Sequence, residues 1–117
     1  MAIIRLYTGP DGKSHFEEIR PTYVPRGDQS ESAVVHEAGG IVIRRFDPAR
    51  SNPWHNAPGR VCVFTLEGAV DIEIGDGTVR RLGAGDILIA EDVAGQGHVT
   101  REVGPAARVS VFVPLTA

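Results

Sequence analysis

Glycine and proline interrupt this chain so often that it has room for at most one helix of ordinary length. The 117 residues include 14 glycines and 8 prolines, and the longest segment free of both spans only residues 28–38. An average α-helix needs about 11–12 residues without a breaker. This segment reads DQSESAVVHEA and has no regular apolar stripe. We therefore expect little or no helix, and a loop that leads into a strand at residues 28–38.

The segments between the breakers have the pattern of short β-strands. Residues 70–74 alternate apolar and polar side chains, a Gly-Asp-Gly turn follows, and residues 78–82 return as a second strand. Strands with turn signals between them recur about every 8–12 residues, which is typical of an all-β sandwich or barrel. The segments expected as strands are 3–7, 16–19, 34–37, 41–46, 61–66, 70–74, 78–82, 87–90, 98–103 and 108–113.

Composition limits the classes of function. With 42% hydrophobic and 23% charged residues, the chain is expected to fold as one domain over residues 1–117. The net charge of −3 and the lack of a basic run argue against a nucleic-acid partner. No apolar segment approaches the ~20 residues that cross a bilayer, and no signal segment is recognisable. The single cysteine, Cys62, excludes an intramolecular disulfide. We expect a cytoplasmic protein with no membrane partner.

Two segments resemble the paired motifs of the cupin superfamily. Residues 54–68 read WHNAPGRVCVFTLEG, and residues 83–98 read GAGDILIAEDVAGQGH. In cupins the first motif carries inward-facing histidines and ends at a glycine, and the second starts with a Gly-Asp turn and ends at a further histidine. The resemblance covers about residues 41–113 and implies a double-stranded β-helix, or jelly-roll barrel. This fold does not by itself define a function, since cupins include enzymes, storage proteins and sensory domains.

The metal-ligand set that the resemblance implies is incomplete here. Metal-binding cupins take two histidines and a glutamate from the first motif and one more histidine from the second. His55 and His98 match two of these positions, but Ala57 and Val61 occupy the other two and have no ligating atom. One divalent metal ion held by His55 and His98, together with water or with a carboxylate from Glu91 or Asp92, is one expectation. A histidine pair that acts as acid and base without a metal is the other.

Four further residues of the two motifs are candidate substrate contacts. Trp54 would form an aromatic wall at the pocket mouth, or simply pack at the end of a sheet. Arg60 would pair with a substrate carboxylate, or lie on the surface. Glu91 and Asp92 would face the pocket and orient His98, or form a solvated turn or a salt bridge to an arginine.

Two strand positions outside these contacts are also informative. Arg44 and Arg45 are adjacent, so one faces each side of the sheet, and the inward one is a second candidate partner for an anion. The sequence does not say which one that is. Cys62 is expected on the face opposite Val61 and Val63, as a buried and unreactive thiol.

Three functions are compatible with these features. The first is a cupin that binds a small polar or anionic organic molecule in its barrel, as a lyase- or isomerase-type enzyme assisted by one divalent ion or by the histidines alone. The alternative is a non-catalytic binding or sensory cupin that has lost its metal centre. The third is a purely structural dimer module.

A homodimer is also expected, partly because most soluble oligomers are symmetric assemblies of identical chains. Residues 1–40 would supply N-terminal strands and a loop at the interface, and residues 41–113 would form the barrel core. The strand at residues 3–7 would either extend a sheet or pair with a second subunit.

Overall fold

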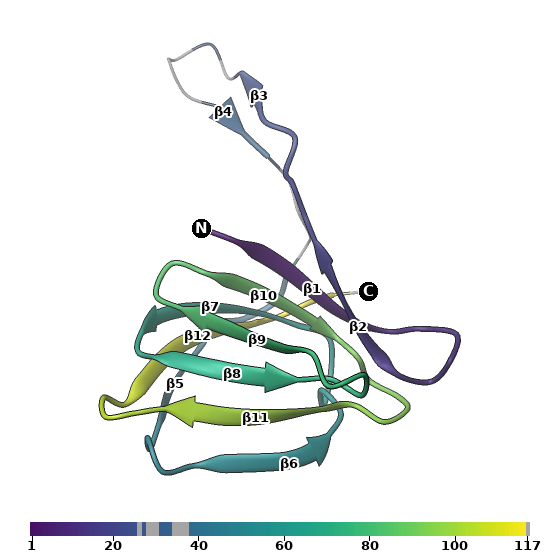
Figure 1. Ribbon diagram of the computed structural model, residues 1–117. Helices are drawn as coiled ribbons and strands as arrows, with labels where there is room; N and C mark the ends of the chain where they lie inside the picture. Colours follow the sequence, from purple (N-terminus) through teal and green to yellow (C-terminus); the bar gives the residue numbers. More distant parts are fainter. Residues whose placement is uncertain (26, 28–30, 34–37, 117) are drawn as a thin grey trace.

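Two β-sheets face each other in the computed structural model (Figure 1), which describes residues 1–25, 27, 31–33 and 38–116. The larger sheet has the strand order β2-β1-β10-β7-β12-β5. Its strands are β2 (Ser14–Glu18), β1 (Ile3–Thr8), β10 (Ile87–Glu91), β7 (Val61–Glu67), β12 (Arg108–Pro114) and β5 (Val42–Phe46). All neighbours in it are antiparallel except β1 and β10, which run parallel.

The smaller sheet is antiparallel throughout and has the order β6-β11-β8-β9. Its strands are β6 (Ser51–His55), β11 (His98–Val103), β8 (Ala69–Glu73) and β9 (Val79–Gly83). A short hairpin of β3 (Val24–Pro25) and β4 (Glu31–Ser32) projects away from the two sheets (Figure 1). The described residues contain no helix, and therefore no helix that could span a bilayer.

The all-β prediction is confirmed. Every strand expected within the described residues is present, with each end within two residues of its expected position, whereas the strand expected at residues 34–37 lies outside the described residues. Strand β6 was not predicted, because Pro53 in its middle lacks the N–H of an interior strand. The structure explains this proline, since β6 is an edge strand paired only with β11. The short β3 and β4 were also missed.

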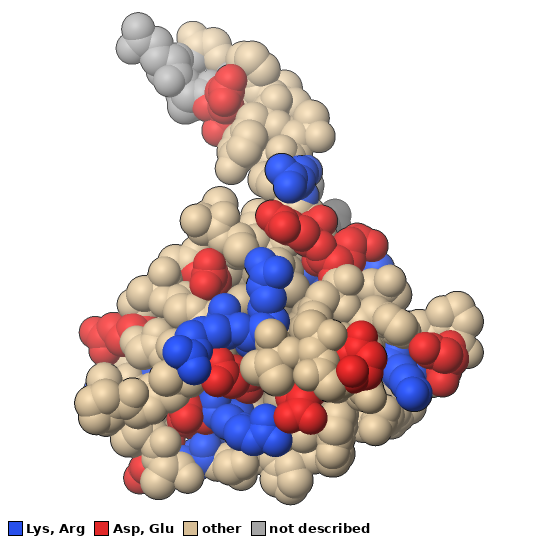
Figure 2. All heavy atoms as spheres, viewed as in Figure 1, with Lys and Arg blue, Asp and Glu red and all other residues tan. Residues whose placement is uncertain are grey.

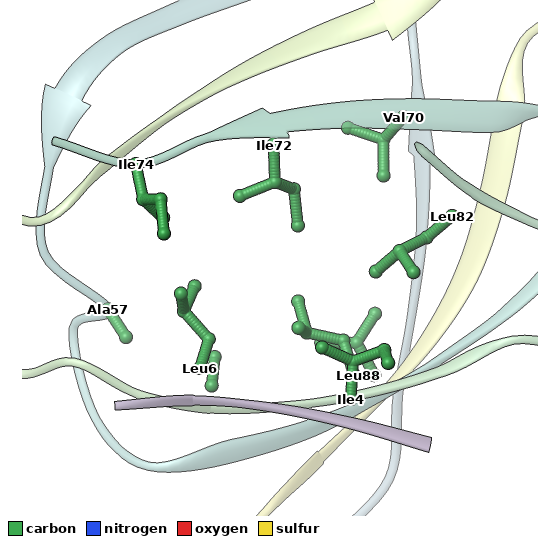
Figure 3. Packing of buried hydrophobic residues seen from close by; sticks show 10 residues of the cluster. Ile4, Leu6, Ala57, Val70, Ile72, Ile74, Leu82 and Leu88 are labelled. Atoms are coloured by element: carbon green, nitrogen blue, oxygen red, sulfur yellow. The ribbon is translucent and has the colours of Figure 1, made fainter. Parts of the chain in front are cut away.

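The alternating strand β8 provides one wall of the hydrophobic core. Val70 and Ile72 of this strand and the following Ile74 are buried, and they point toward Leu6 and Leu88 from the opposite sheet (Figure 3). This is the period-2 burial that the sequence pattern predicted. Complete burial of side chains of this size stabilises the fold by about 1.5–3 kcal/mol each.

The first strand lies inside the larger sheet. β1 is flanked by β10 on one side and by β2 on the other, and its Ile4 and Leu6 are 1% and 0% exposed. Of the two expectations for this strand, extension of a sheet is therefore the one observed. Residues before position 41 thus contribute to the core, whereas their part in a dimer interface stays a prediction.

Asp86 fixes the Gly-Asp turn and the start of β1 together. Its carboxylate accepts hydrogen bonds from the backbone N–H groups of Ala2 (3.0 Å) and Gly83 (2.9 Å). Partial burial acts to raise the pKa of Asp86, but these two hydrogen bonds and the nearby N-terminus outweigh it and lower the pKa. The turn of the second motif therefore holds the N-terminal strand in place beside β10.

Candidate functional site

A cavity of about 750 Å³ opens between the two sheets. Strands of both sheets contribute to its wall, which is mostly apolar with a few convergent polar groups, as in many ligand-binding sites. The polar and charged residues that line it are Arg44, Arg50, Asn52, His55, Asn56, Arg60, His98, Thr100 and Arg108.

The structure brings the two candidate histidines together on this wall. His55 of β6 and His98 of β11 are direct cross-strand partners, and their ring centroids lie 4.4 Å apart with an interplanar angle of 56°. His98 is only 5% exposed, and His55 is half-buried. The two imidazoles thus form one unit at the inner surface of the cavity.

Each ring is oriented through its Nδ1 atom. Nδ1 of His55 donates to the carbonyl oxygen of Pro53 at 2.7 Å, and Nδ1 of His98 donates to Oδ2 of Asp92 at 2.5 Å. We assign these tautomers from the acceptors, because a carbonyl and a carboxylate oxygen accept hydrogen bonds. In the neutral form each ring then has its lone pair on Nε2, and neither Nε2 has a hydrogen-bond partner among the described residues.

The carboxylate that orients His98 is completely buried. Asp92 is 0% exposed, and the hydroxyl of Ser14 in β2 donates to the same Oδ2 atom at 2.6 Å. Its other oxygen, Oδ1, has no partner within the described part of the chain. Burying a carboxylate with incomplete pairing is costly, and such groups are concentrated at functional sites.

The side chains at this wall do not fit a resident cupin-type metal centre. Ala57 and Val61 line the cavity and offer only alkyl groups. Within the described residues no group of three or more His, Cys, Asp or Glu side chains is arranged to hold a metal ion. His55 and His98 supply two imidazole nitrogens, fewer than the three or four protein ligands of typical zinc or iron sites.

Glu91 and Asp92, adjacent in sequence, have different partners. Glu91 does not line the cavity but accepts hydrogen bonds from Nε of Arg5 at 2.7 Å and from Nε of Arg60 at 2.6 Å. Burial acts to raise the pKa of Glu91, yet the two arginines outweigh it and hold the pKa below its ordinary value. Of the expectations for Glu91, the salt bridge to an arginine is the one observed, and it is Asp92 that orients His98.

The other predicted contacts are only partly brought together. Arg60 lines the cavity while paired with Glu91, whereas Trp54 is 44% exposed and does not line the cavity. Asp92 lies behind His98 and also does not line the cavity. Direct contact of Trp54, Glu91 or Asp92 with a ligand stays a prediction.

Strand alternation decides the question between Arg44 and Arg45. Arg44 lines the cavity together with Val42 and Phe46 of the same strand, so Arg45 faces the other side. Arg50 and Arg108, which were not predicted, also line the cavity and lie over the ring of Phe46 in the same strand as Arg44. No local pattern marks them, because they reach the site from separate segments.

The predicted orientation of Cys62 is confirmed, although its side chain is half-buried and not fully buried as expected. Val61 and Val63 line the cavity, whereas Cys62 faces a smaller hollow on the opposite side of the sheet together with Phe64 and Ile89. Burial raises the pKa of the Cys62 thiol to about 11. The thiolate is the reactive form, so Cys62 is expected to be inert near neutral pH.

Comparison with known proteins identifies the fold. No protein-family model and no curated protein sequence matches the chain. An uncharacterised conserved protein of Klebsiella pneumoniae with a double-stranded β-helix domain has a similar structure, with a TM-score of 0.52, 25% sequence identity, and coverage of 79% of this chain and 81% of that one. A Neisseria meningitidis protein is similar at a TM-score of 0.50 and 15% identity, over 83% of this chain and 84% of that one.

The chain therefore has the double-stranded β-helix fold of the cupins. Its all-β architecture, its two facing sheets and its similarity to the Klebsiella domain agree on this point. These similarities define the fold and assign no activity to this chain.

Gly97 is needed for the close approach of the two histidine-bearing strands. It has a φ of 75°, and an added Cβ would overlap the carbonyl oxygen of His55. Gly77 has a similar φ of 87° with open space around it. We expect Gly77→Ala to cost about 1 kcal/mol from backbone strain, and Gly97→Ala a further ~1–3 kcal/mol from overlap. Urea denaturation of both variants measures this, and equal losses would show that His55 does not constrain position 97.

The pairing of Glu91 predicts a pH-dependent contribution to stability. Its pKa is lowered in the folded state, so the ionised group stabilises the protein above the unfolded value of about 4.5, and this contribution is lost as the pH falls through the folded pKa. Glu91→Gln should lower the free energy of unfolding by about 1–3 kcal/mol at pH 7, with a deficit that shrinks below pH ~4.5.

The matched control for this variant is Glu17→Gln. Glu17 lies 3.8 Å from the same arginine, Arg5, but is half exposed, so its loss should cost less than about 0.5 kcal/mol. Urea denaturation at several pH values measures both variants. A deficit of Glu91→Gln that is independent of pH would contradict the ion-pair explanation.

Proposed function

We propose that the cavity binds a small polar or anionic organic molecule and that His98 exchanges a proton with it. The observation that carries the proposal is the hydrogen bond between buried Asp92 and Nδ1 of His98. It supports a base at Nε2, because an imidazole that donates its Nδ1 proton to a carboxylate has its other nitrogen free to accept a proton. The apolar wall supports the same conclusion, since exclusion of water strengthens these interactions.

His55 is the natural second participant. Its ring contacts that of His98, and the carbonyl of Pro53 fixes its orientation. His98 would accept a proton at Nε2 from an acidic C–H or O–H of the ligand. His55, in its imidazolium form with a proton on both ring nitrogens, would give its Nε2 proton to a neighbouring atom of the ligand, and proton exchange with solvent would restore both rings. Removal and return of a proton at different positions is the chemistry of isomerases and of lyases. General acid–base catalysis of this kind contributes about 10²–10⁴-fold to a rate.

A non-catalytic binding or sensory protein is the second candidate. It is favoured by Ala57 and Val61, which place alkyl groups where metal-binding cupins have ligands. In this case the cavity would retain its ligand and the histidines would only contribute hydrogen bonds.

The homodimer also remains a proposal. It is supported by Ile41 and Ile43 at the edge strand β5, which are 75% and 71% exposed. An apolar strand edge of this kind favours pairing with a second copy.

Deuterium exchange tests the proton transfer. A panel of 2-oxo acids and 1,3-dicarbonyl compounds is incubated with the protein in D₂O and followed by ¹H NMR. We expect wild type to accelerate C–H exchange of at least one compound about 10²-fold or more over buffer, and His98→Gln to abolish the acceleration. His15→Gln is the matched control, since His15 pairs with Asp11 at 2.9 Å but does not line the cavity. Binding without exchange would favour the second candidate.

Metal content separates a metal-assisted site from a metal-free one. With only two imidazole ligands, wild type purified without a tag or chelator should hold well under one equivalent of divalent metal by elemental mass spectrometry. Near-stoichiometric metal that is lost in both His55→Ala and His98→Ala would overturn this expectation and show that water or substrate completes a centre on the two histidines.

A further inference from the structure

Three arginines converge on one phenyl ring at the end of the cavity formed by β5 and β12. The guanidinium carbons of Arg108, Arg44 and Arg50 lie 3.9, 4.7 and 4.9 Å from the centroid of the Phe46 ring. All three arginines and Phe46 line the cavity. We refer to Arg44, Arg50 and Arg108 as the arginine cluster.

Only one carboxylate among the described residues compensates these three charges. Glu102 is almost fully buried and accepts two parallel hydrogen bonds from Arg108, at 2.7 and 3.0 Å. Arg50 lies 3.9 Å from the same carboxylate. Arg108 also donates to the hydroxyl of Ser110 at 2.9 Å, so its guanidinium is rigidly held. The cluster therefore carries an excess of positive charge at the cavity wall.

Arg44 has no ion pair among the described residues. Its guanidinium instead lies near two phenyl rings, 4.7 Å from the centroid of Phe46 and 5.0 Å from that of Phe112. Partial burial, followed by repulsion from Arg50 and Arg108, lowers the pKa of Arg44. Contact with aromatic rings restrains a guanidinium while leaving the N–H groups on its edge available to an anion.

We propose that the arginine cluster binds the carboxylate of an organic acid whose apolar or aromatic body lies along the cavity. This assignment rests on the proposed function and names the class of its ligand. A planar carboxylate matches the fork of a guanidinium. The adjacent wall consists of Val42, Val63, Val70, Ile72, Leu88 and Phe112, which suits an apolar body better than the polar body of a sugar phosphate.

The cluster and the histidines line the same cavity, so one ligand can contact both. With its carboxylate at Arg44 and Arg50, an acid of this class would be anchored at one end and would extend toward His98. The anchored end would then limit which atoms of the ligand reach Nε2 of His98.

The test compares 4-phenylbutyrate with its uncharged amide, 4-phenylbutanamide, by calorimetric and NMR titration. We expect the acid to bind wild type about 10- to 100-fold more tightly than the amide, because charge-assisted hydrogen bonds are lost with the carboxylate. Arg44→Gln and Arg50→Gln should each lower the affinity for the acid by a similar factor and leave the affinity for the amide unchanged. Arg45→Gln, one position away on the outer face of β5, is the matched control and should have no effect.

The other outcomes overturn the assignment. If acid and amide bind equally and Arg44→Gln changes neither, the cavity binds organic molecules without a carboxylate subsite. The assignment is also wrong if neither compound binds at up to about 10 mM. It is equally wrong if Arg45→Gln lowers the affinity for the acid as much as Arg44→Gln does. The deuterium exchange at His98 is measured with other compounds and decides the proposed function separately.

Discussion

Buried Asp92 joins three parts of the chain that are far apart in sequence, two through its carboxylate and one through its backbone. Its side chain accepts hydrogen bonds from Ser14 in the N-terminal hairpin and from His98 in β11, and its backbone carbonyl accepts one from the N–H of Ala57. A carboxylate in an apolar interior is tolerated only when it is hydrogen-bonded. The first hairpin, the turn of the first motif and the strand that carries His98 are therefore held in one arrangement, and the histidine pair depends on it.

Much of the fold was predictable because local rules determine it. Glycine and proline set the strand boundaries, and burial every second residue in β8 follows from the pleat. On the face shown in Figure 2, acidic and basic side chains are interspersed, as the absence of basic runs in the sequence suggested. The strand β6 could not be recognised because the acceptability of Pro53 depends on its position at a sheet edge, which is a property of the whole sheet.

The candidate site was predictable mainly where it coincides with a motif, and strand alternation added only that one of Arg44 and Arg45 faces inward. His55 and His98 were found through the cupin resemblance, and the structure pairs them. Glu91 and Asp92 could not be told apart, because both are carboxylates at the end of one strand and only the packing decides which of them meets the histidine. Arg108 could not be recognised at all, since its partners come from other strands and the contacts form only when the sheets close.

The adjacency of Glu91 and Asp92 has a consequence for how sequences of this kind can change over evolution. Side chains alternate along β10, so Ala90 lines the cavity while Glu91 faces Arg5 and Arg60, and Asp92 returns to the interior. Gain or loss of a single codon within this strand would exchange the two environments. The ion pair and the histidine contact would then be lost together. Selection should therefore tolerate substitutions in this segment far better than changes in its length.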